Sequence, residues 1–128
     1  MVRCAFVVLV VALTAAAAAS AAPERRTAAY CSPSGDVCYR VDAPRNVVTF
    51  RLTLAARYFA RYRLCVRPPA GAATCKSFPV RRVGAAYGGS VRWERNFPNR
   101  GPGFYKVTWR LGTRPLGPAL TFRSGGPR

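Results

Sequence analysis

The chain has 128 residues, with 21 Lys or Arg against four Asp or Glu and no histidine, which gives a formal net charge of +17 at pH 7. This length predicts one domain with a single small core. The acidic residues are scattered at Glu24, Asp36, Asp42 and Glu94. With no histidine and with scattered carboxylates, no Ser-His-Asp set or metal cluster can be assembled, and no phosphate loop is present. We therefore expect a protein that is not an enzyme and needs no cofactor.

The first 21 residues have the three-part order of a secretory signal peptide. A basic start at Arg3 precedes an apolar run over residues 4–13, and small residues lead to an expected cleavage between Ala21 and Ala22. An uncleaved membrane anchor is the alternative, because residues 4–22 are nearly uncharged. The strongly apolar part is short for a membrane span, which favours cleavage and export to the envelope or the medium. Loss of residues 1–21 removes only the charge of Arg3, from +17 to +16.

Apolar and polar residues alternate in the middle of the chain, which is typical of strands with one buried face. In residues 47–54, for example, Phe50 and Leu52 share one side and Thr49 and Arg51 share the other. The predicted strands are residues 37–41, 47–54, 61–67, 90–94, 104–111 and 119–123. Segment 54–62 is expected to be a crossover turn or a single helical turn.

Turn signals such as "PSGD", "PPAG" and "NRGPG" separate these strands. The pattern predicts an all-β fold, a single small antiparallel β-sandwich of about seven or eight strands over residues 30–123. Residues 22–29 and 124–128 are expected to be flexible tails. In the long strand 104–111, the alternation places Tyr105, Val107, Trp109 and Leu111 inward.

Four cysteines follow the predicted signal peptide, at Cys31, Cys38, Cys65 and Cys75. An even number in an exported chain predicts disulfides, and four cysteines allow three pairings. Each local pair brackets turn residues that bring flanking strands together, so we predict Cys31–Cys38 and Cys65–Cys75, both on outer faces. Zinc is the alternative, but the spacing and the lack of histidine argue against it, so we expect no metal.

The ending "PGFYKVTWRLGTRPLGPALTF", residues 102–122, resembles the last strand pair of immunoglobulin-like and fibronectin type III-like sandwiches. Gly103, Tyr105 and Val107 have the G-x-Y-x-V spacing of those domains. The resemblance implies that Tyr105 forms a tyrosine corner, with its hydroxyl reaching back to the preceding loop. An ordinary core tyrosine in a strand is the alternative. The inter-sheet disulfide and the third-strand tryptophan of antibody domains are missing. The whole chain also resembles small exported proteins of high-GC actinobacteria, which implies a bacterial envelope setting and no particular activity.

A sandwich order would gather basic side chains of three strands on one outer face. These candidate anion-binding residues are Arg61, Arg63, Arg67, Lys106, Arg110 and Arg123. Rows of guanidinium groups suit phosphates and carboxylates, so an anionic cell-wall polymer, an anionic lipid surface or an acidic polysaccharide is the expected partner. The alternative is a solvated face that only keeps the protein soluble. Sequence-specific nucleic-acid binding is not expected, because no such motif is present and the aromatic residues fall mostly at inward positions.

The sequence therefore predicts a secreted, strongly basic, non-catalytic β-sandwich that acts as a binding or accessory module of the cell envelope. Two other functions stay open. One is a structural accessory domain for a protein partner, which would require an exposed apolar patch. The other is a cationic protein that acts on membranes, although such proteins usually carry a basic amphipathic helix.

Overall fold

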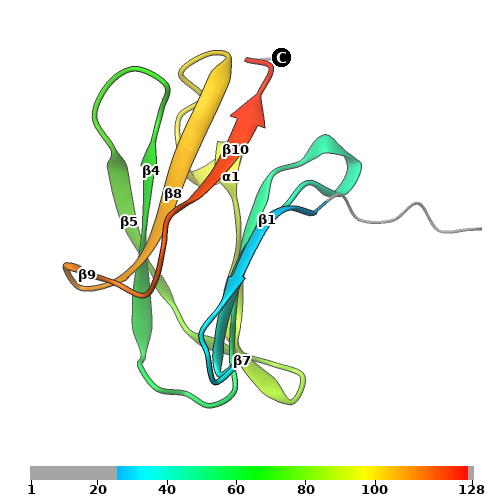
Figure 1. Cartoon of the computed structure of the whole chain (residues 1–128), viewed down its shortest axis with the longest axis vertical. Coiled ribbons are helices and arrows are strands. Elements are labelled where there is room, and N and C mark those ends of the chain that lie inside the picture. Colours follow the sequence, from blue (N-terminus) through cyan, green and yellow to red (C-terminus); the bar gives the residue numbers. More distant parts are fainter. Residues whose placement is uncertain (1–25, 127–128) are drawn as a thin grey trace, which may run out of the picture.

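The computed structural model describes residues 26–126, which form two antiparallel sheets packed face to face (Figure 1). Sheet A has the order β1 (Arg26–Cys31), β2 (Val37–Asp42), β3 (Thr49–Leu54), β7 (Ala86–Arg92) and β6 (Arg81–Val83). Sheet B has the order β10 (Leu120–Ser124), β8 (Gly103–Leu111), β4 (Arg61–Arg67) and β5 (Thr74–Pro79), and the two-residue β9 (Arg114–Pro115) pairs with β8. The predicted all-β sandwich is confirmed.

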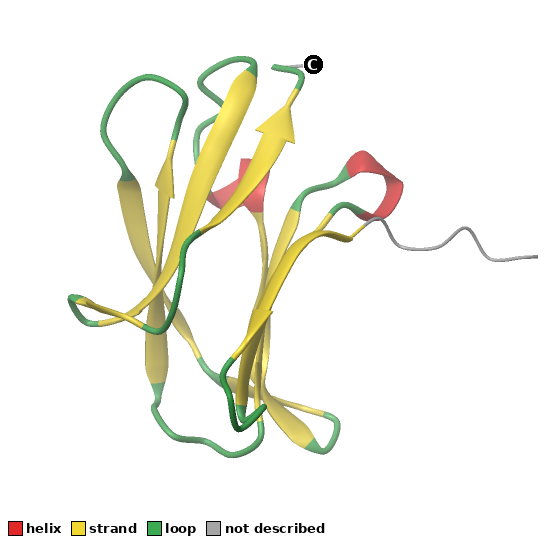
Figure 2. Cartoon of the chain, in the orientation of Figure 1, coloured by secondary structure: helices red, strands yellow, loops and turns green. Residues whose placement is uncertain are grey.

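Two short helical turns lie at one end of the sandwich (Figure 2). They are η1 (Pro44–Asn46), between β2 and β3, and α1 (Trp93–Asn96), directly after β7. Within residues 26–126, no helix is long and apolar enough to cross a bilayer. The predicted signal peptide, residues 1–21, lies outside the described residues.

The core consists mainly of aromatic side chains from both sheets. Tyr39 of β2 stacks on Trp109 of β8 with ring centroids 4.4 Å apart, and Phe50 of β3 lies 5.6 Å from Phe122 of β10. Each of these rings is at most 3% exposed. Since a buried aromatic residue removes about 150–250 Å² from water, such pairs account for much of the attraction between the sheets.

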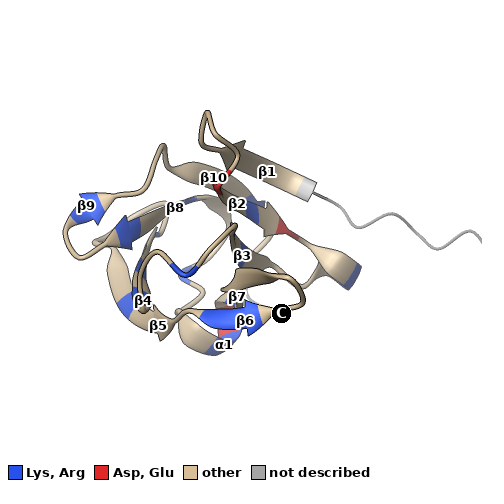
Figure 3. Ribbon diagram, turned by 90° about the horizontal axis from the view of Figure 1, so that it is seen from below, with Lys and Arg blue, Asp and Glu red and all other residues tan. Residues whose placement is uncertain are grey.

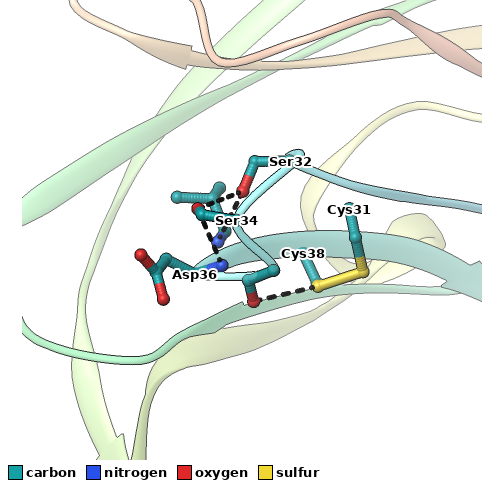
Figure 4. The surroundings of a disulfide bond; sticks show 7 residues. Cys31, Ser32, Ser34, Asp36 and Cys38 are labelled. Atoms are coloured by element: carbon teal, nitrogen blue, oxygen red, sulfur yellow. Dashed lines mark hydrogen bonds between the residues drawn. A yellow bond between two sulfur atoms is a disulfide. The ribbon is translucent and has the colours of Figure 1, made fainter.

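Both predicted disulfides are present. Cys31 lies opposite Cys38 in the β1–β2 pair, and Cys65 lies opposite Cys75 in the β4–β5 pair, with Cα–Cα distances of 4.1 Å. In the first hairpin the hydroxyl of Ser32 accepts a hydrogen bond from the backbone N–H of Val37 at 3.2 Å (Figure 4). Both bridges lie on outer faces, but Cys65 is only 7% exposed. Disulfides of this kind are typical of oxidising compartments outside the cytosol.

The predicted N-terminal tail, residues 22–29, is wrong for its last four residues. Strand β1 begins at Arg26 and pairs with β2, while Ala28 and Tyr30 pack against the core. A register shift between Arg26 and Ala28 interrupts the alternation there, so the sequence gives no clear strand signal. At the other end Ser124, also placed in a tail, belongs to β10.

Three further details differ from the sequence prediction. The described part of the chain has ten strands instead of seven or eight, because β6 and β9 are only three and two residues long. Trp93 is buried, but it begins α1 instead of continuing the strand predicted over residues 90–94. Leu111 is 42% exposed instead of inward, because β8 ends there in a turn at Gly112, where φ is 62°. Segment 55–60 is the crossover from sheet A to sheet B.

Candidate anion-binding face and adjoining cleft

Six basic side chains lie on the outer face of sheet B, the surface called here the basic face. In β4 the exposed arginines alternate with the buried Tyr62, Leu64 and Val66. The same alternation in β8 and β10 turns their basic residues outward. All six predicted residues are therefore together on this face: Arg61, Arg63, Arg67, Lys106, Arg110 and Arg123.

Four of these residues form two cross-strand pairs of like charge. Arg63 of β4 lies opposite Arg110 of β8, and Arg67 lies opposite Lys106. Side chains directly opposite each other have Cβ atoms about 5 Å apart, and like charges at that distance destabilise a sheet. None of the three acidic residues within residues 26–126 lies in a strand of sheet B, and few acids stand among the basic residues in Figure 3.

Neutral groups orient part of the basic face. Arg61 donates from Nε to the hydroxyl of Ser77 at 3.0 Å, and Arg110 donates from Nη1 to the carbonyl of Thr113 at 3.0 Å. The guanidinium of Arg123 lies 5.8 Å from the ring centre of Phe104. These contacts position the arginines without neutralising them, so their charge stays available to a ligand.

The outer face of sheet A also has a cross-strand pair of arginines, but an acidic residue lies beside that pair. Arg40 of β2 lies opposite Arg51 of β3, but Oδ2 of Asp42 accepts a hydrogen bond from Nε of Arg40 at 2.6 Å and forms an ion pair with Nε of Arg51 at 3.0 Å. The Asp42 side chain is 2% exposed, while each arginine side chain is 35% exposed. Asp42 therefore compensates two arginines, and the sequence offered no sign of this contact beyond an acid at a strand end.

A cleft of about 670 Å³ borders the basic face where β10 approaches η1 and α1. Its floor includes the buried rings of Trp93 and Phe122, and its walls carry polar groups and one exposed ring. The polar and aromatic groups on its walls include Asn46, Glu94, Phe104, Thr121 and Arg123. Arg123 and Phe104 belong to both surfaces, so the cleft and the basic face are continuous.

Sequence reasoning missed Phe104, which is 66% exposed. Successive side chains of a strand point to opposite faces, and the neighbouring Tyr105 is buried. The alternation therefore predicts that Phe104 points outward. The cleft could not be inferred in that way, since η1, α1 and β10 are far apart in the sequence.

The start of β8 is fixed by Tyr105, as the resemblance implied. The Tyr105 hydroxyl donates to the carbonyl of Gly101 at 2.7 Å and accepts from the backbone N–H of Arg100 at 2.9 Å. The phenol thus holds the preceding loop and orients the strand that presents Phe104 and Lys106.

Two other buried phenols are poor acids. Burial raises the pKa of Tyr62 to about 12, and burial together with the neighbouring Tyr30 raises the pKa of Tyr39 to about 12. Neither phenol offers a base near neutral pH. In the described part of the chain, no group of three His, Cys, Asp or Glu residues lies close enough to hold a metal ion.

Comparison of the chain with known protein families, with curated proteins and with solved structures finds no match in any of the three. The function must therefore be inferred from the chemistry of the basic face and of the cleft.

Proposed function

We propose that this protein is an exported, non-catalytic β-sandwich that binds anionic polymers through the basic face of sheet B. The observation that carries the proposal is the pair of uncompensated contacts, Arg63 opposite Arg110 and Arg67 opposite Lys106, with no acid on the same sheet. Such pairs reduce the stability of the free protein, and an anion bound between them would relieve the repulsion.

A polymer fits this arrangement better than a single small anion. Successive outward residues of a strand are about 7 Å apart and neighbouring strands about 5 Å apart, so the six cations form a two-dimensional array. A chain with repeated negative charges can contact several of them at once and release several counterions. Arginine adds bidentate hydrogen bonds to carboxylates and phosphates.

The proposed setting is the outside of a cell, where the two disulfides would persist. The partners considered are an anionic wall polymer, an anionic lipid surface and an acidic polysaccharide. An immunoglobulin-like relationship is part of the proposal and has two supports. The order β2-β3-β7 corresponds to the first, second and fifth main strands of such sandwiches, and the order β10-β8-β4 to the seventh, sixth and third. Tyr105 also forms the corner contact.

A salt titration with a matched pair of variants tests this proposal. The exported protein is titrated with a polyanion at several salt concentrations, beside R63Q/R110Q on the basic face and R81Q/R82Q on β6 of sheet A. Both double variants lose two charges. We expect R63Q/R110Q to weaken binding about tenfold or more. Its slope of log K against log salt concentration should correspond to the release of about two fewer counterions, while R81Q/R82Q should have a small effect.

The alternative, a solvated face that only confers solubility, predicts a different result. Equal losses in the two double variants would mean that net charge alone attracts the polymer. Binding no tighter than that of an unrelated protein of equal charge would also overturn the proposal.

A further inference from the structure

The exposed ring of Phe104 is the feature of the basic face that anion binding leaves unexplained. It is 66% exposed and stands among Arg123, Lys106 and the other outward cations of sheet B. Leaving a phenylalanine in water forgoes the favourable free energy of burying its ring. A single exposed apolar residue is common on protein surfaces, but this one lies at the mouth of a cleft and beside a guanidinium.

The cleft has the size and lining of a small-molecule site. Its volume of about 670 Å³ lies within the roughly 300–1,000 Å³ of such sites. Trp93 and Phe122 form an apolar floor, and Asn46, Glu94 and Thr121 supply neutral or acceptor groups around it. Within residues 26–126, no ion pair involves Glu94, so its carboxylate can accept hydrogen bonds from hydroxyl groups.

This combination fits a sugar ring that carries an acidic group. The C–H face of a pyranose packs on an aromatic ring, its hydroxyls hydrogen-bond to amides, hydroxyls and carboxylates, and its acidic group pairs with an arginine. Phe104, Glu94 and Arg123 supply these three kinds of contact within one cleft. A polyphosphate has no ring and would use only the cations.

We infer that the cleft binds one pyranose of an acidic polysaccharide while the rest of the polymer crosses the basic face, an inference that rests on the proposed function. The pairing of β8 with β10 and β4 gives a continuous route for the polymer. Phe104 lies opposite Arg123, Lys106 opposite Arg67 and Arg110 opposite Arg63, so successive outward positions of β8 lead from the cleft across the cations. Nucleic-acid bases also stack on aromatic rings, but binding a single strand usually requires several aromatic residues in a row. Among the described outward positions of β4, β8 and β10, Phe104 is the one aromatic residue.

The test compares polymers with and without rings. A polyuronate, a polyphosphate of similar length and single-stranded DNA are titrated against the wild type, F104A, F104W and L111A. Leu111 is the matched control, because it is an exposed apolar residue at the other end of β8. Melting temperatures confirm that all variants are folded.

We expect F104A to weaken polyuronate binding about fivefold to tenfold, which corresponds to the loss of one ring contact, and to weaken polyphosphate binding less than twofold. The loss should persist at high salt, because stacking is not electrostatic. F104W should keep the affinity for polyuronate, and L111A should match the wild type.

Four results would overturn the inference. An equal loss of polyphosphate binding in F104A would mean that Phe104 only positions Arg123. A larger loss for single-stranded DNA than for polyuronate would assign the ring to nucleic acid. If the wild type binds polyphosphate and polyuronate equally and F104A changes neither, the cleft inference fails while the proposed function stands. If the wild type binds no polymer, both fail.

Discussion

The two sheets carry the same arrangement of arginines with opposite electrostatic outcomes. In sheet A, Arg40 and Arg51 lie opposite each other and share the buried carboxylate of Asp42. In sheet B, Arg63 and Arg110 lie opposite each other with no acid in the sheet. The basic residues of this protein therefore differ in effect. Arg40 and Arg51 of sheet A are compensated by an acid of the same sheet, whereas Arg63 and Arg110 of sheet B have no acid beside them in their sheet.

The largest effect is expected when the compensation in sheet A is removed. D42N removes the negative charge that Arg40 and Arg51 share, while the amide oxygen of the asparagine can still accept a hydrogen bond. Breaking a buried ion pair typically costs about 3–5 kcal/mol, and the half-exposed arginines reduce this to about 2–4 kcal/mol. Chemical denaturation measures the free energy of unfolding.

The matched control is D36N, which removes the same charge from an exposed turn. Its free energy of unfolding should stay within about 0.5 kcal/mol of the wild type. If D42N and D36N were equally stable, Asp42 would not be the compensating group of sheet A.

The disulfide of sheet B gives the next effect. Cys65 and Cys75 join β4, the strand of Arg61, Arg63 and Arg67, to the outer strand β5. C65A/C75A should lower the free energy of unfolding by about 2–3 kcal/mol, because the unfolded chain loses a short closed loop. The double variant C31A/C38A makes the same change in sheet A, and mass measurement after reduction confirms both bridges by a gain of four hydrogens in the wild type. No loss of stability in C65A/C75A would contradict this prediction.

Each sheet also contains a buried phenol with a raised pKa, which should limit stability at high pH. The pKa of Tyr39 in β2 and that of Tyr62 in β4 are raised from 10.0 to about 12. The stabilisation is fully present below pH 10 and is lost as the pH rises through about 12, because the unfolded state releases these protons first. Ionisation of Tyr39 also removes its hydrogen bond to the carbonyl of Pro118.

The measurement is the free energy of unfolding at several pH values above 9. Y62F and Y39F should each reduce its decline with pH, while Y58F, a change at a phenol that is 53% exposed, should leave the decline unchanged. A decline that is the same in all four proteins would show that the buried phenols do not cause it.

Much of this fold could be predicted because its signals are local. Alternation in residues 47–54 and 61–67 identified β3 and β4, and turn residues between cysteines identified both disulfides. The basic face followed from the same alternation once the strands were placed in one sheet.

The missing parts depend on contacts that no local pattern encodes. Strand β1 is held by its pairing with β2 despite an irregular register, and α1 is too short at four residues to show a helical period. The contact of Asp42 with Arg51 depends on the β2–β3 register, and the cleft depends on the approach of β10 to η1 and α1.

The smallest expected effect comes from replacing one arginine of each pair with glutamate. This substitution should raise the free energy of unfolding in sheet B and lower it in sheet A. R63E places a carboxylate opposite Arg110 and turns a repulsive pair into an attractive one. We expect this variant to be more stable by about 0.5–1 kcal/mol and to bind polyanions more weakly. R51E places a carboxylate beside the buried Asp42 and should destabilise the protein. Denaturation and polymer titration of both variants measure the two effects, and a loss of stability in R63E would show that its arginine pair is compensated in some other way. If R63E gains stability while it loses binding, the uncompensated charge of sheet B is maintained at the expense of folding, which is the pattern expected of a binding surface.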